Sequence, residues 1–222
     1  MSVSRGPLKA IADTLICPYC GTRNAVYPGK TDRIDPGRLE EALITGGPMP
    51  NLISEFSISV FLRGHAILSE VLRKGEAHAL ERNIAPSVLL TARLFPDMLP
   101  LTRQIQLAVD TAKRTVARLA AIEPSSSDNN ETTFGELQSR INNTSEFIKA
   151  HAADTLTKSA ERIIEFKMGQ NTASLPISLY IERFALPNFY FHLTTAYNIM
   201  RHNGVVLGKM DYLGDLALPL GT

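Results

Sequence analysis

The sequence predicts an all-α protein: a four-helix bundle with a small two-stranded β-hairpin before the last helix and an irregular N-terminal extension. Four long stretches repeat apolar residues at helical spacing, and short segments connect them. The apolar spacing changes to strict alternation just before the last of these stretches. The first 50 residues hold six of the 13 prolines and six of the 14 glycines, which is typical of turns.

Three segments follow from this pattern. Residues 1–51 form the extension, with one short helix expected at residues 36–44. The helical domain spans residues 52–216, and residues 217–222 form a tail.

The first helix is expected from Ile53 to about Asn83. Its two apolar rows share one face: Phe56, Val60, Ile67 and Val71 in one row, and Phe61, Leu68 and Leu72 in the other. Pro86 suits the first turn of a short helix over residues 87–94.

The second helix is expected over residues 97–122, with Asp97 as its N-cap. Its apolar stripe consists of Leu101, Ile105, Ala108, Ala112, Val116 and Leu119. Thr133 is the expected cap of the third helix, whose stripe consists of Phe134, Leu137, Ile141, Thr144, Ile148 and Ala152.

The hairpin is predicted from two alternating stretches around "GQNTA", residues 169–173. One strand places Ile164, Phe166 and Met168 on a face, and the other places Leu175, Ile177 and Leu179 on a face. Pro176 requires an edge position, because it has no N–H to donate. The last helix should end at His202 or Asn203, with Gly204 as its C′ residue and a kink or restart at Pro187.

His192 and His202 lie in the last helix, in "ALPNFYFHLTTAYNIMRHNG", residues 185–204. They cannot share a metal ion, because ten residues separate them by about 80° around the axis and roughly 15 Å along it. A second ligand on the face of His192 would stand at position 196, which is Ala196. His192 shares its face with Phe189, Thr195, Ala196 and Ile199, so it should point into the bundle. It is either a hydrogen-bonded core histidine or a general base or ligand in a bundle pocket.

The other histidines point to structural roles. His202, in the last turn, should interact favourably with the helix dipole. His65 lies on the apolar face of the first helix and is expected in the core. His78, between Glu76 and Glu81, is expected on the solvated surface.

A polar stripe runs along the second helix beside the apolar one. Asp97, Gln104 and Thr111 recur every seven residues, flanked by Arg103 and Gln106. Polar groups on facing bundle helices can converge on one site. The candidate site residues are His192, as an acid or base, and Tyr197 or Gln104, which would assist it.

"CPYC", Cys17–Cys20, is the other candidate motif. A redox site would place it at the start of a helix after a strand, but "GTRNAVYPGK" is a poor helix. A zinc site of four cysteines would need two more thiols than the chain has, unless two copies shared it. We interpret the motif as part of an irregular extension.

Composition excludes several classes of function. Lysine and arginine number 23 and aspartate and glutamate 22, so no basic stripe for nucleic acid is indicated. No stretch has the ~18 apolar residues of a membrane span, and the N-terminus lacks a secretory apolar region. We expect a cytoplasmic protein with free thiols and without nucleic-acid or membrane partners.

Four stretches together resemble a known family: "VFLRGHAILSEVL", "ARLFPDMLPLTRQIQLAVDTAKRTVARLAA", "TTFGELQSRI" and "FALPNFYFHLTTAYNIMRHNGVVLGKMDYLG". They are similar to the family catalogued as domain of unknown function nineteen-ninety-three, roughly over residues 52–214. That family belongs to the superfamily of DinB-like and YfiT-like proteins, which are regarded as metalloenzymes. The resemblance implies a four-helix bundle with a β-insertion before the last helix, a pocket near His192 and a possible homodimer. It implies no reaction.

The superfamily's metal pattern has one histidine on the second helix and a His-x-x-x-His pair on the last. This sequence has no histidine in residues 97–122, and Ala196 stands where the partner of His192 would be. No metal ligands are therefore predicted, and the cofactor stays open. Three hypotheses remain: an enzyme on a small molecule with His192 as acid or base, a non-catalytic dimeric small-molecule-binding or structural protein, and a metalloprotein using His192 with Asp or Gln ligands.

Overall fold

The computed structural model describes residues 52–125, 128–158, 162–168 and 170–215. The predicted extension, its short helix at residues 36–44 and its "CPYC" motif lie outside the described residues, as does the tail at residues 217–222. The domain boundary at residue 52 stays a prediction.

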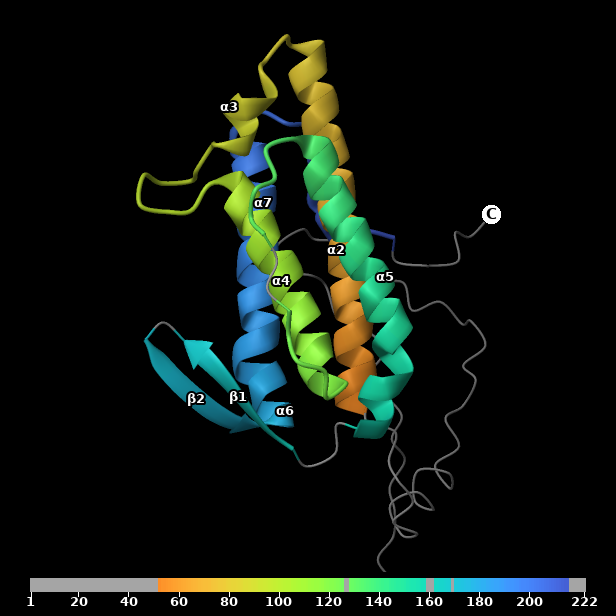
Figure 1. The fold of residues 1–222 in the computed structure, drawn as a ribbon. Helices are drawn as coiled ribbons and strands as arrows, with labels where there is room; N and C mark the ends of the chain where they lie inside the picture. Colours follow the sequence, from red (N-terminus) through yellow and green to blue (C-terminus); the bar gives the residue numbers. More distant parts are fainter. Residues whose placement is uncertain (1–51, 126–127, 159–161, 169, 216–222) are drawn as a thin grey trace, which may run out of the picture. The chain divides into compact units, whose positions relative to one another are not determined.

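Four long helices form the bundle that the sequence predicts (Figure 1): α2 (Leu52–Glu81), α4 (Leu101–Leu119), α5 (Phe134–Lys158) and α7 (Leu186–His202). Helix α4 packs against both α5 and α7, and α2 packs against α5 and α7. The predicted apolar stripes supply the core, in which Phe61, Leu68, Leu101, Leu137 and Phe189 are completely or almost completely buried. The all-α fold class is confirmed.

The start of α4 differs from the prediction. Asp97 is not its N-cap: the helix begins at Leu101, and Pro100 occupies the cap position in an extended conformation. A residue that precedes proline is disfavoured in the helical region, so Leu99 cannot continue the helix backwards to Asp97. Instead, Ala92 accepts a 2.9 Å hydrogen bond from the Leu101 amide. The short helix α3, Pro86–Leu90, also ends earlier than expected.

The start of α5 is as predicted. Thr133 Oγ accepts a hydrogen bond from the Glu136 amide at 3.2 Å, and the Glu136 carboxylate accepts one from the Thr133 amide at 3.0 Å. This reciprocal pair is a capping box, which satisfies two amides that would otherwise have no partner in the helix.

The predicted hairpin is confirmed, but its second strand is displaced. Strand β1 (Ile163–Met168) pairs antiparallel with β2 (Asn171–Pro176), with Ile163 opposite Pro176 and Met168 opposite Asn171. Ile177 and Leu179, expected in the strand, lie in the short helix α6, Ile177–Tyr180. Pro176 ends the strand, because it occupies the N-cap position of α6 and Ile177 makes the last backbone bond, to Arg162 O at 2.9 Å.

The chain stays helical from α6 into α7. A π-helical turn, η1 (Ile181–Ala185), joins them and ends just before Pro187, the second residue of α7. Proline lacks an N–H and clashes with an α-helical carbonyl four residues earlier. The wider π turn before Pro187 accommodates the missing N–H and relieves the clash.

The C-terminus of α7 ends as predicted, at His202. Gly204 adopts a φ of +87°, and the Val205 amide donates to Met200 O at 3.1 Å. This is a Schellman motif, in which glycine accepts the left-handed conformation without strain. His78 packs against Gly204 and is buried, so its predicted place on the solvated surface is wrong. The short helix α8, Lys209–Leu213, was also not predicted.

None of the described helices is long and apolar enough to cross a membrane.

Candidate functional site

His192 lies on the face of α7 that packs against α4. Its Nδ1 lies 2.7 Å from Gln104 Oε1, and Gln104 Nε2 donates to Leu99 O at 3.1 Å. The second bond fixes which end of the amide is the oxygen, so Oε1 accepts and Nδ1 carries the proton. This tautomer is assigned from the hydrogen-bond network. It leaves the lone pair on His192 Nε2.

His192 is largely buried, with 8% of the residue exposed. Among the described residues its Nε2 has no hydrogen-bond partner, and it is not one of the sealed, unpaired atoms. His65 is the opposite case: its Nδ1 bonds Ser145 at 2.9 Å, while its Nε2 is sealed without a partner. The two inward-facing histidines therefore differ in their second ring nitrogen, which is sealed in His65 and is not sealed in His192.

The environment keeps His192 neutral. Burial, together with the positive charge of Arg103, lowers the pKa of His192 from 6.5 to about 4. Both effects disfavour the imidazolium form. At neutral pH the side chain therefore offers a hydrogen-bond acceptor at Nε2 and no positive charge.

Two polar pairs lie in the α4–α7 seam, the contact surface between these two antiparallel helices, and a third joins α4 to the adjoining α6. Gln104 bonds His192, Asn188 Nδ2 donates to Thr111 Oγ at 2.7 Å, and Thr115 Oγ lies 3.2 Å from the Tyr180 hydroxyl of α6. The predicted polar stripe of Gln104 and Thr111 thus faces α7. Asp97 is not part of it, since α4 starts after that residue.

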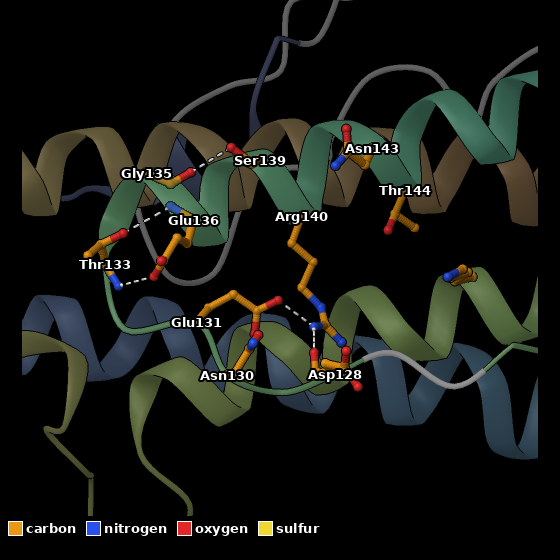
Figure 2. A pocket seen from close by; sticks show the side chains of 11 residues that line it. Asp128, Asn130, Glu131, Thr133, Gly135, Glu136, Ser139, Arg140, Asn143 and Thr144 are labelled. Carbon is orange, nitrogen blue, oxygen red and sulfur yellow. Dashed lines mark hydrogen bonds and ion pairs between the residues drawn. The ribbon is translucent and has the colours of Figure 1, made fainter.

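A chain of hydrogen bonds links the site to α5. Arg103 donates to Gln106 at 2.7 Å, and Gln106 donates to Glu131 at 2.6 Å. Arg140 of α5 bonds Glu131 and Asp110, each at 2.5 Å. Figure 2 shows Arg140 reaching from α5 toward Glu131 and Asp128. This buried ion network was not predicted from the sequence.

Arg140 and Glu131 of this network line a pocket of about 680 Å³ (Figure 2). Its lining includes Lys113, Glu131, Glu136, Ser139 and Asn143. The charge of Arg140 is balanced by two carboxylates, and Glu136 caps α5. These groups already have partners inside the protein, so we place the candidate site at His192 instead.

Tyr197 lies apart from the other two predicted site residues. Its ring packs edge-on against Tyr212 of α8, with centroids 5.5 Å apart. Five residues along α7 correspond to about 140° around the helix axis from His192. The structure brings His192 and Gln104 together and turns Tyr197 away from them.

The described residues do not fit the superfamily's metal pattern. Gln104 engages one ring nitrogen of His192, and the next turn of α7 on that face carries Ala196, which is fully buried. In the part of the chain that the structure describes, no three His, Cys, Asp or Glu side chains gather where they could hold a metal ion. Gln104 faces the imidazole Nδ1 rather than serving as a ligand beside it.

Comparisons with known proteins bear on this geometry. A profile of the family described as "Domain of unknown function (DUF1993)" matches residues 53–213. The crystal structure of a DinB family member protein from Shewanella denitrificans is similar, with 35% sequence identity and a TM-score of 0.67. That match covers 78% of this chain and 97% of the other. Among curated proteins, none matches this chain.

Proposed function

This chain belongs to the DUF1993 family and has the DinB-like fold, and we propose that it is a small-molecule-binding protein whose site is built on His192 and Gln104. One observation carries the proposal: Gln104 holds a neutral imidazole in one tautomer, and the other ring nitrogen has no hydrogen-bond partner among the described residues and is not sealed. Such a nitrogen is a fixed acceptor for an N–H or O–H of a ligand.

Binding is favoured over proton transfer by the pKa of His192. Acid–base catalysis is most efficient when the pKa of the catalytic group lies near the working pH. The pKa of His192 is about 4, because burial and Arg103 both oppose its protonation. At neutral pH His192 therefore accepts hydrogen bonds while remaining unprotonated.

Arg103 suggests the class of ligand. It lies near enough to lower the pKa of His192, and among the described residues its guanidinium makes no ion pair with a carboxylate. The preferred ligand is therefore a small polar molecule that donates a hydrogen bond to His192 and carries negative charge toward Arg103. Exposed Phe191, whose ring contacts that of His192, offers apolar surface beside it.

A thermal-shift screen of small organic acids on the full chain tests the proposal. A ligand at 100 times its Kd should raise the free energy of unfolding by about 2.7 kcal/mol. The rise should persist in His202→Ala, a matched change at an exposed histidine of the same helix. It should disappear in His192→Ala. Ligands that stabilise all three proteins equally would contradict the proposed site.

A general-base enzyme is the second candidate, supported by the tautomer that Gln104 fixes. NMR of a bound ligand over time distinguishes the two. Conversion that is lost in His192→Ala, with a rate that is flat above pH 5, would favour the enzyme.

A homodimer and a cytoplasmic location stay predictions; sedimentation velocity tests the first.

A further inference from the structure

A groove on the other side of α7 lies among α2, α7 and α8. Its volume is about 280 Å³, near the lower end of the ~300–1,000 Å³ range of ligand pockets. Val60, Ile67 and Leu193 give it apolar walls, while Arg63, Tyr190 and Tyr212 supply its polar groups. His192 faces α4 through Gln104, so this groove is separate from the site described above.

Gly64 of α2 is one of the residues that line the groove. A Cβ on this residue would lie only 2.4 Å from two ring atoms of Phe189. The missing side chain therefore lets the buried Phe189 ring approach the α2 backbone, beside Leu193. An apolar ligand segment in the groove would contact aliphatic and aromatic carbon.

Helix α8 forms one wall of the groove, and contacts with α2 and α7 fix its position. Asp211 pairs with Lys74 of α2 at 2.6 Å, and the Tyr212 hydroxyl lies 2.7 Å from Thr194 Oγ of α7. Arg63 donates from Nε, at 3.1 Å, and from one terminal nitrogen to Leu213 O. These contacts from two long helices give a five-residue helix a fixed position.

The same contacts orient Arg63 without neutralising it. A guanidinium has five N–H groups, and the bonds to Leu213 O use two. The two terminal nitrogens keep a parallel pair of N–H groups, which matches the two oxygens of a carboxylate. Among the described residues, no carboxylate pairs with Arg63. Tyr190 supplies a hydroxyl in the same groove. Burial, together with Tyr212, raises the pKa of this hydroxyl above its usual value, and the charge of Arg63 opposes part of that rise.

We propose that this groove binds a small carboxylic acid with an apolar chain. The carboxylate accepts hydrogen bonds from the free N–H pair of Arg63 and from the Tyr190 hydroxyl. The chain lies on Val60, Ile67 and Leu193. The pairing of one unneutralised cation with apolar walls selects an amphipathic anion over a neutral lipid or a polar anion.

Isothermal titration of the full chain with octanoate tests this, with octanol as the neutral probe of equal length. Octanoate should bind about fivefold or more tightly than octanol, since an exposed ion pair contributes up to about a fivefold effect and bidentate geometry adds to it. Arg63→Gln should lose that preference. Tyr190→Phe, which keeps the ring, should weaken octanoate binding and leave octanol binding unchanged. Arg73→Gln, an exposed arginine of the same helix paired with Glu70, is the matched control and should bind as the wild type.

Equal affinity for octanoate and octanol, or an unchanged preference in both Arg63→Gln and Tyr190→Phe, would overturn the proposal. So would octanoate binding that disappears in His192→Ala and survives in Arg63→Gln, because the ligand would then occupy the α4–α7 seam. Failure to bind octanoate, together with a dimer that Tyr190→Phe or Arg63→Gln weakens, would assign the groove to a second copy of the chain.

Discussion

Gln104 accepts a 2.7 Å hydrogen bond from His192 across the α4–α7 seam, and this bond decides which imidazole nitrogen faces outward. Since Gln104 is itself anchored to Leu99 O, the amide cannot turn without losing a second bond. A side chain on α4 thus presets the chemistry of a side chain on α7, 88 residues later.

Gln104→Glu should raise the pKa of His192. A carboxylate next to Nδ1 stabilises the imidazolium form, by roughly 1–3 pKa units for a close pair. NMR titration of the His192 ring protons measures the shift. An unchanged pKa would mean that residue 104 does not contact the imidazole.

His65 should make the fold sensitive to acid. Burial lowers its pKa from 6.5 to about 4. Between these pH values the unfolded chain binds a proton that the folded chain does not, so stability falls as the pH drops. The loss between pH 7 and pH 5 should be about 2 kcal/mol from this residue. Urea unfolding at both pH values measures it.

His65→Leu separates this effect from other titrations. It also removes a sealed Nε2 that has no partner, so stability at pH 7 should stay equal or rise. The drop between pH 7 and pH 5 should shrink by about 2 kcal/mol relative to the wild type. His202→Leu, at an exposed position, is the control and should keep the full drop.

Gly64→Ala and Gly135→Ala should have opposite effects. The first places a methyl group 2.4 Å from the Phe189 ring, and overpacking of this kind costs about 1–3 kcal/mol. The second meets no atom within 4 Å and lies in the first turn of α5, where alanine is favoured by up to about 1 kcal/mol. Thermal unfolding of both variants compares them. Equal stability would contradict the close α2–α7 approach.

Asp110→Asn should destabilise the protein strongly. The change removes one of the two carboxylates that balance the buried Arg140 and leaves Glu131 as the other, so the loss of one buried hydrogen bond to a charged group should cost about 1.5–3 kcal/mol. Asp110 and Arg140 are 5% and 8% exposed. Glu146→Gln breaks an exposed pair with Lys149 and should cost less than about 1 kcal/mol. Chemical denaturation ranks the two; similar costs would show that the Asp110 pair is solvated.

The sequence predicts the bundle well because each long helix carries a continuous apolar stripe. The Thr133 cap and the Gly204 terminus were also predicted, since each depends only on neighbouring residues. The prediction of Asp97 as the N-cap of α4 was wrong, because Pro100 has an extended backbone and a capping pattern does not reveal this. Ile177 fits a strand by alternation, yet it is buried as the first residue of α6.

The site was predicted in part. His192 and Gln104 were both chosen from helical spacing, and the structure brings them into contact. Tyr197 follows His192 by five residues, and helical rotation carries it to α8 instead of to the site. His78 was misplaced because its burial depends on Gly204, which is far away in the sequence. The Arg140 network likewise joins α4, a loop and α5, and no local pattern encodes it.

The most direct test of the account is a ¹⁵N NMR titration of the histidine side chains, with His192 assigned by its loss in His192→Ala. We predict a neutral ring protonated at Nδ1 down to about pH 5, with a pKa of about 4, and a ring that becomes mixed in tautomer in Gln104→Ala. A ring protonated at Nε2, or a pKa near 6.5, would contradict the central claim that Gln104 and burial hold His192 as a neutral acceptor.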